Sequence, residues 1–224
     1  MQLNLAGMSI ILYLGCLLAG FLISLFWKPA DRVVTGLSKV YLYLVLLSVV
    51  STWIFYFAGI KNAPVLRIIS EELSWTGIGS HMILGYLLGR LASGTVWSTL
   101  NTTLWAMTIL YGNTFIVATV GKSTNMPEMI SFFKQSGYAV WFLYFIMAAE
   151  TAGAIGVLTN FRLRLGPAAT ICLMVIMLGA VYTHWHNGDP FSDSYAAVSQ
   201  LITGSLLLFL YSRRTILVKN RNPK

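Results

Sequence analysis

The residue in this sequence best placed to do chemistry is an ionisable side chain inside a long apolar segment. Glu150 lies near the middle of the apolar run at residues 138–159. A charged side chain at that depth of a membrane costs about 2.5 to 3.5 kcal/mol on insertion scales, so Glu150 is expected to face the interior of a helix bundle. Because burial disfavours the charged form, we expect a protonated group at rest that can donate or accept a proton. The alternative is that Glu150 only hydrogen-bonds a neighbouring helix.

A lysine ends the apolar run that precedes this one. Lys122 follows the run at residues 97–120, and its long side chain could reach the membrane surface and anchor the helix there. It could instead hold an anionic substrate, such as a sulfur oxyanion, or pair with a carboxylate outside the membrane. We predict Lys122 as a substrate-binding residue and keep the interfacial anchor as the alternative.

A third polar set lies nearer the C-terminus, where His184 and His186 precede Asp189 and Asp193. Histidine and carboxylate ligands can bind zinc or copper. Residues two apart in a helix point roughly 200° away from each other, so both histidines could share one ion only if the helix has already ended. We predict no metal here and assign His184 and His186 as catalytic proton or substrate contacts and Asp189 to substrate binding. Interface packing and capping, including a helix cap at Asp193, form the alternative.

Seven apolar runs are long enough to position these side chains within a lipid bilayer. A hydrocarbon core of about 30 Å requires about 20 helical residues, and a helix satisfies its own backbone polar groups there. The composition, 57% hydrophobic and 10% charged, leaves no room for a water-soluble domain. We therefore predict an all-α integral membrane protein with seven transmembrane helices. The runs cover residues 7–27, 39–60, 74–92, 97–120, 138–159, 166–184 and 196–212.

The distribution of basic residues predicts the orientation of these helices. Short cytoplasmic loops collect Lys and Arg, and seven spans with the N-terminus outside and the C-terminus cytoplasmic place most of the 15 basic residues on the cytoplasmic side. Since these cations lie in loops, the net charge of +8 indicates no nucleic-acid partner. The predicted cytoplasmic set is Lys28, Arg32, Lys39, Arg90, Arg162, Arg164, Arg213, Arg214, Lys219, Arg221 and Lys224, and the outer set is Lys61, Arg67, Lys122 and Lys134.

Two further segments, the third apolar run and an amphipathic stretch, are predicted from their residue patterns. The third run is the weakest span, and its Gly85 and Gly89, with Gly77 and Gly79, favour close helix packing. The amphipathic stretch at residues 125–137 predicts a surface helix, because a proline suits the first turn and apolar residues form one side. That helix could cover a pocket between the fourth and fifth spans, or pack against the bundle without any ligand.

The order of several short motifs resembles the DoxX family of small four-helix membrane proteins. The motifs are Tyr111-Gly112, Gly121-Lys122, the amphipathic stretch 126–137, the segment 148–154 around Glu150, the short link 162–166 and the segment 184–189. The resemblance implies a DoxX-like four-helix unit at residues 96–214, preceded by a three-helix extension at residues 1–95 and followed by a basic cytoplasmic tail at residues 215–224.

The same resemblance implies a membrane subunit tied to redox chemistry. In some members of the family the reactants are sulfur compounds or quinones. We therefore expect a subunit of an oxidoreductase system in the bacterial cytoplasmic (inner) membrane, with a quinone as the cofactor this hypothesis allows and a protein partner supplying the redox centre. The alternative is a non-catalytic assembly factor or structural subunit of a larger membrane complex.

Overall fold

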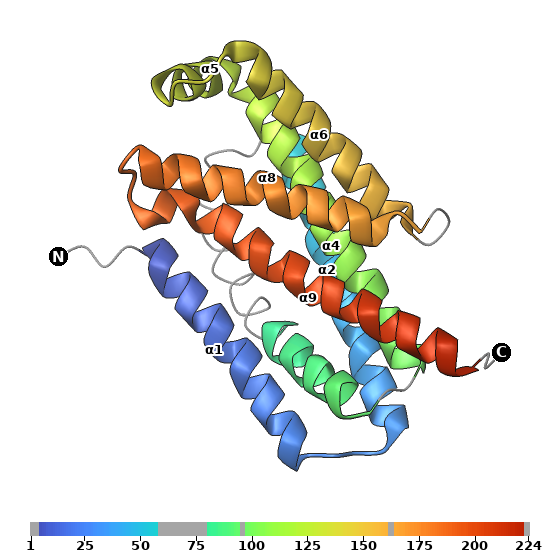
Figure 1. The fold of residues 1–224 in the computed structure, drawn as a ribbon. Helices are drawn as coiled ribbons and strands as arrows, with labels where there is room; N and C mark the ends of the chain where they lie inside the picture. The colour runs from blue at the N-terminus through green and yellow to red at the C-terminus, as the bar shows by residue number, and fades with distance from the viewer. Residues whose placement is uncertain (1–4, 58–79, 95–96, 161–163, 222–224) are drawn as a thin grey trace. The chain divides into compact units, whose positions relative to one another are not determined.

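The computed structural model describes residues 5–57, 80–94, 97–160 and 164–221, and these residues form helices joined by short links, without a β-strand (Figure 1). The predicted all-α class is confirmed. A helix whose beginning lies outside the described residues covers 80–93. The others are α1 (Leu5–Phe26), α2 (Asp31–Phe57), α4 (Trp97–Thr124), α5 (Met126–Gln135), α6 (Val140–Leu158), α8 (Gly166–His186) and α9 (Phe191–Arg221).

Among the described residues, five helices are long and apolar enough to cross a membrane. They are Asp31–Ile54, Trp97–Thr124, Val140–Leu158, Gly166–His186 and Phe191–Val218. Only 22% to 39% of the most apolar window of each is buried within the protein, so most of this apolar surface is left for lipid. The chain is therefore an integral membrane protein.

The first and third predicted spans are covered in part. The helix α1 covers the first predicted span. Its apolar part, Leu14–Phe26, is shorter than the five helices that could cross a membrane. The 80–93 helix takes up the end of the third, while its first residues, with Gly77 and Gly79, lie outside the described residues. The count of seven spans and the orientation of the termini stay predictions.

The chain forms two compact units. Unit 1 comprises Met1–Ala106 with Ser212–Lys224, and unit 2 comprises Met107–Tyr211. The divisions fall inside α4 and α9, which each contribute residues to both units. The domain boundaries that the sequence suggested, in the link before α4 and after residue 214, stay a prediction.

Unit 1 is held together by close contact between α1 and the 80–93 helix. A Cβ added at Gly20 would collide with the carbonyl of Met82, and one at Gly85 with the carbonyl of Leu17. Gly89 faces the hydroxyl of Ser24 in the same way. The predicted role of Gly85 and Gly89 in helix packing is confirmed, because small residues are what let two backbones approach inside a membrane.

Unit 2 has a core formed by the end of α4, by α6, α8 and by the first part of α9. Glycines on three of its helices also face large neighbours: Gly112 lies on Leu158, and Gly153 lies on Leu173. The link into α8 is fixed by the buried side chain of Asn160, which accepts a 2.8 Å hydrogen bond from the backbone of Gly166. The largest fully buried side chains of this unit are Met107, Tyr111, Phe115, Leu143, Glu150, Leu173, Leu207 and Leu210.

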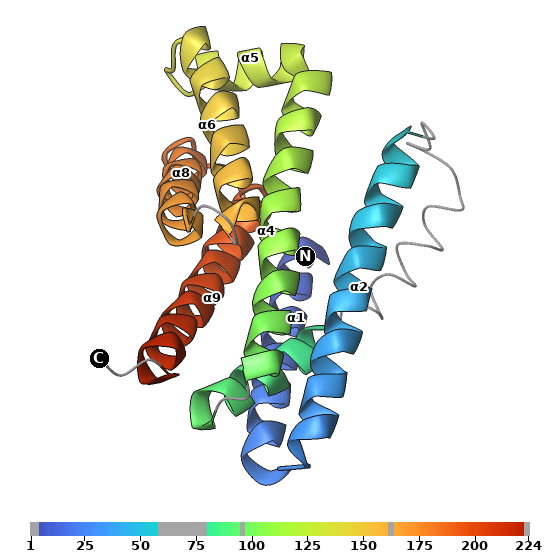
Figure 2. The same ribbon diagram turned by 90° about the vertical axis from the view of Figure 1, so that its right-hand side faces the viewer.

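The helix α5 lies across the ends of α4 and α6 (Figure 2). It begins one residue after α4 ends, with a proline in its first turn, so the predicted amphipathic helix is confirmed, and its placement on the membrane surface stays a prediction. It ends in a Schellman motif, in which Gly137 has φ 81° and Tyr138 donates its backbone N–H to Phe133 O at 2.8 Å. The rings of Phe133 and Phe142 lie 6.2 Å apart and join α5 to α6.

The glycine contact in unit 1 yields a stability prediction. Gly85→Val places two methyl groups against the backbone of α1, and the helices must separate. We expect the free energy of unfolding to fall by about 1 to 3 kcal/mol, the range for overpacking a close contact. Denaturant titration in detergent measures this loss. Gly15→Ala is the matched control, since a Cβ at Gly15 meets nothing within 4 Å. Equal stability of the two variants would contradict the close approach.

Candidate functional site

The centre of unit 2 is an ion pair between two helices. The Lys122 ammonium on α4 lies 2.7 Å from Glu150 Oε1 and 2.6 Å from Oε2 on α6. The Glu150 side chain is 1% exposed and that of Lys122 is 21% exposed. Contact with both carboxylate oxygens at this distance is typical of a charge-assisted hydrogen bond. The two residues that the sequence singled out separately are thus one site.

A threonine completes the site on α4. Thr119 donates its hydroxyl to Glu150 Oε2 at 3.3 Å. Since Thr119 and Lys122 are three residues apart in a continuous helix, they share the face of α4 turned to α6. Sequence analysis missed Thr119, although its spacing before Lys122 was a usable signal. Glu150 lies ten residues into α6, a rise of about 15 Å from Val140 at 1.5 Å per residue.

The pairing changes the electrostatic interpretation of Glu150. The sequence predicted a protonated carboxyl, because an isolated charge inside the bundle would be costly. In the structure the amino group of Lys122 lies within hydrogen-bond distance of both oxygens of the Glu150 carboxyl group, and the protonation state of Glu150 stays a prediction. Lys122 therefore directs its charged end to a buried carboxylate, a partner the sequence did not indicate.

A second polar pair lies at the C-terminal end of α8. His184 Nδ1 and Asp189 Oδ2 are 2.8 Å apart. A Schellman motif brings them together: Gly188 has φ 73°, and the backbone N–H of Asp189 donates to His184 O at 3.0 Å. Residues 187–190 therefore form the turn that follows α8. An ionised Asp189 can only accept, so it selects the tautomer with hydrogen on Nδ1 and leaves Nε2 of His184 for exchange.

Contacts with the α5 end hold this second pair in place. The rings of Phe132 and His184 lie 5.2 Å apart. Asn187 donates to the hydroxyl of Ser136 at 2.8 Å, and the hydroxyls of Tyr138 and Thr183 are 3.0 Å apart. We call these residues, together with Asp189, the α5–α8 cluster. Sequence analysis assigned the histidines a role and missed these partners.

The second histidine takes a different direction. His186 is exposed and stacks on Tyr182 with ring centroids 5.8 Å apart and an interplanar angle of 12°. Since α8 continues to His186, the two imidazoles do not converge. No group of three or more His, Cys, Asp or Glu side chains able to hold a metal ion occurs among the described residues.

Asp193 lies inside a helix. The sequence predicted it as a cap before a span beginning at residue 196, but α9 begins at Phe191. Asp193 is therefore in the first turn, where a negative charge interacts favourably with the helix dipole.

Three buried hydroxyl groups add to the polar interior of unit 2. Thr108 and Tyr111 on α4 and Thr170 on α8 are buried, and their side-chain oxygens find no hydrogen-bond partner among the described residues. The first two are three residues apart and share one face of α4. Sequence analysis noted Tyr111 only as part of a motif of the family resemblance, and it passed over the two threonines because threonine is unremarkable in an apolar run.

Fold and site together define a helical integral membrane protein with a buried lysine–glutamate pair. Residues 106–208 match the DoxX-like family, a segment that contains the Lys122–Glu150 pair and the α5–α8 cluster. The predicted resemblance is therefore confirmed over these residues. No curated protein and no solved structure matches the chain.

The buried pair yields a double-variant cycle. Removing Lys122 leaves the carboxyl group of Glu150, which is 1% exposed, as an uncompensated buried charge, so we expect Lys122→Met alone to lower the free energy of unfolding by about 3 to 5 kcal/mol. We expect a smaller loss from Glu150→Leu alone, because the lysine left behind is 21% exposed. The double variant should recover most of that loss, because two well-packed apolar side chains often replace a buried pair at little cost. Thermal or denaturant unfolding in detergent measures both effects.

The control for this cycle is Glu128→Gln on α5, a carboxylate that is exposed. It should stay within about 0.5 kcal/mol of the unaltered protein, as exposed substitutions usually do. Purely additive losses in the double variant would show that the two groups do not interact in the folded protein.

Proposed function

We propose that the DoxX-like unit is a membrane subunit of an oxidoreductase system in which the Lys122–Glu150 pair exchanges a proton with a quinone or a small reduced substrate. The observation that carries this proposal is the buried pair itself. An ionisable pair inside a membrane bundle is costly and is a functional candidate by default. Similarity to the DoxX-like family over residues 106–208 gives the class of subunit.

The pair is suited to proton exchange. A carboxylate and an ammonium 2.6 Å apart can share a proton with little movement of heavy atoms, and an approaching carbonyl oxygen could accept a proton from Lys122. Thr119 holds one carboxylate oxygen and so fixes the side chain that receives the next proton. In this proposal Lys122 also orients an anionic or electron-rich substrate, as the sequence suggested.

The α5–α8 cluster would form the route to the pair. His184, with Nδ1 directed at Asp189, presents Nε2 as a proton donor or acceptor, while Asp189 sets its tautomer. The exposed His186 would make the first contact with solvent or substrate. The buried hydroxyls of Thr108 and Tyr111 could donate to quinone oxygens deeper in the unit.

The redox centre would come from elsewhere. A partner protein or the substrate must supply it, since the side chains of the proposed site hold and move protons but carry no electrons. We propose the bacterial cytoplasmic membrane as the location, following the family resemblance, and a membrane complex as the setting.

A second candidate is a non-catalytic assembly or structural subunit. The observation that favours it is that Lys122 already contacts both carboxyl oxygens of Glu150. In that case the pair fixes the packing of α4 on α6 and does no chemistry.

One set of variants separates the two candidates. A proton-exchanging pair predicts that the double variant Lys122→Met with Glu150→Leu folds and inserts but loses at least about 100-fold in electron transfer to a quinone, the lower end of the range for removing a general acid–base group. A structural pair predicts near-normal activity from the same protein. The measurement is quinone reduction by membranes that carry the whole complex, with the variant quantified by immunoblot.

Glu128→Gln, on the exposed face of α5, is the matched control and should retain full activity. Binding of a quinone analogue to the purified full-length protein, followed by quenching of tryptophan fluorescence, gives an independent readout. Absence of analogue binding together with an active double variant would leave the structural role as the function of the pair.

A further inference from the structure

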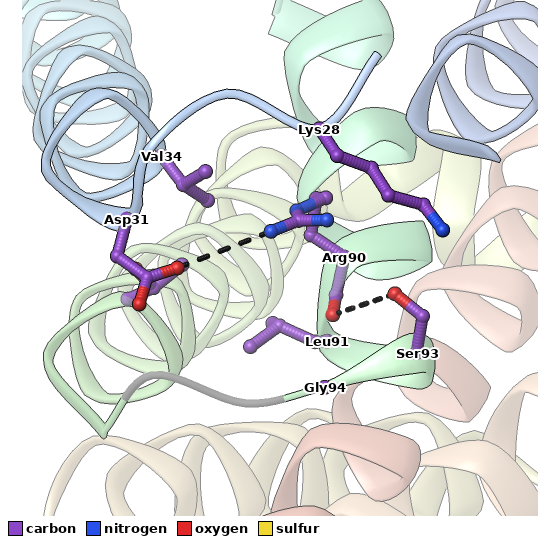
Figure 3. Close-up of a pocket in the computed structure, with 8 residues that line it drawn as sticks. Lys28, Asp31, Val34, Arg90, Leu91, Ser93 and Gly94 are labelled. Atoms are coloured by element: carbon purple, nitrogen blue, oxygen red, sulfur yellow. Dashed lines mark hydrogen bonds and ion pairs between the residues drawn. The ribbon is translucent and has the colours of Figure 1, made fainter. Parts of the chain in front are cut away.

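Unit 1 contains a polar pocket that no part of the proposed redox function uses. Its volume is about 390 Å³, and it lies where the link between α1 and α2 meets the end of the 80–93 helix (Figure 3). All of its lining residues lie outside residues 106–208, the segment similar to the DoxX-like family. The lining residues are Lys28, Asp31, Val34, Arg90, Leu91, Ser93, Gly94 and Thr99.

Arg90 stands in the middle of this pocket with unused hydrogen-bonding capacity. Its side chain is 18% exposed, and its Nε–H is buried without an acceptor among the described residues. The one described carboxylate near it is that of Asp31, with Oδ1 3.9 Å from Arg90 Nη2, which is too long for a hydrogen bond. A buried donor left without an acceptor is costly, so the Nε–H of Arg90 favours binding of a ligand that carries a hydrogen-bond acceptor.

The charge of the pocket favours an anion. Lys28 forms no ion pair with a described residue, and Figure 3 shows Arg90 between Lys28 and Asp31. The Asp31 side chain is 70% exposed, so it is free to turn outward. Asp31 also begins α2, and the positive end of that helix adds to the attraction for an anion.

The pocket lies at one end of the helices of unit 1. The rings of Trp27 and Tyr86 are 5.3 Å apart, and the hydroxyl of Tyr86 donates to Trp27 O at 3.2 Å, which joins the end of α1 to the 80–93 helix. Arg213 donates to the carbonyl of Ala92 at 3.3 Å and adds another cation at this end. Tryptophan and basic residues together are typical of the level of lipid headgroups.

We propose that this pocket binds a phosphate group through Arg90 and Lys28. The planar guanidinium offers several N–H donors in a fixed fork that matches phosphate oxygens, and the lysine adds a point charge. The volume exceeds that of a bare ion, and Val34 and Leu91 supply an apolar wall. The phosphate belongs either to an anionic lipid headgroup or to a free phosphate compound, and the two sources are separated by experiment.

The test uses the full-length protein in mild detergent and native mass spectrometry of intact complexes. One arm titrates phosphatidylglycerol and the other inorganic phosphate, with and without the lipid. Arg90→Gln should weaken binding about tenfold, as expected for losing one charge-assisted hydrogen bond. Lys28→Gln should weaken it severalfold. Asp31→Asn removes a negative charge that competes for Arg90 and should tighten binding severalfold.

The matched control is Arg32→Gln. Arg32 is an exposed basic residue at the same end of α2 that does not line the pocket, so its loss should change affinity by less than about twofold if surface attraction contributes little. Asp31→Asn alters an exposed side chain and keeps the test decisive even if Arg90→Gln fails to fold.

Tight binding of the lipid that inorganic phosphate does not displace assigns the pocket to a headgroup. Binding of inorganic phosphate with the same order of variants assigns it to a free phosphate compound. Binding of neither probe overturns the proposal. So does an Arg32→Gln loss equal to that of Arg90→Gln, or an Asp31→Asn protein that binds no more tightly than the unaltered one.

Discussion

The contact on which unit 2 depends is the ion pair between Lys122 and Glu150. A carboxylate 1% exposed inside a membrane bundle requires a partner, and the lysine on the facing helix is that partner. The same contact fixes the rotation of α4 against α6, because turning either helix would separate the two charges and leave each buried alone. A buried pair is weak evidence for net stability, yet it strongly constrains how the two helices can pack. The proposed proton exchange and the packing of the two helices therefore place conflicting demands on Glu150.

The second constraint is the close approach of helix backbones, and it follows from the lipid that surrounds the helices. Lipid chains are as apolar as leucine, so helices inside a bilayer gain little from burying apolar side chains and associate through tight packing and polar contacts. Gly20 and Gly85 let α1 and the 80–93 helix touch backbone to backbone, and Gly112 and Gly153 admit large leucines within unit 2. Large apolar side chains such as Trp141, Val175 and Leu178 stay exposed on the outside of these helices, where lipid is their natural neighbour.

The two units carry different kinds of polar site. Unit 2 holds a closed pair and the α5–α8 cluster, in which every main member has a partner: His184 with Asp189, Tyr138 with Thr183, and Asn187 with Ser136. Such a set can relay a proton only by exchanging partners. The pocket of unit 1 is open and has a buried donor without an acceptor among the described residues, which is the property of a binding site. Similarity to the DoxX-like family covers the first kind of site and not the second.

The sequence by itself determined the membrane class and the all-helical fold, and it singled out Lys122 and Glu150. Apolar runs of bilayer length predict helices without tertiary information, because each helix satisfies its own backbone hydrogen bonds. Gly137 and Gly188 likewise mark where α5 and α8 end, since both positions need a positive φ. Which side chains contact each other between helices could not be predicted from local sequence patterns. Lys122 and Glu150 are 28 residues apart, and their contact depends on how α4 and α6 are rotated about their axes, which no local pattern encodes. For the same reason the sequence offered Lys122 an anchoring role, a substrate or a carboxylate outside the membrane, and offered Glu150 an acid role or a hydrogen bond to a neighbouring helix, without joining the two residues. Only the packed bundle, in which the buried carboxyl group of Glu150 meets the partly exposed lysine, decided that they form one pair.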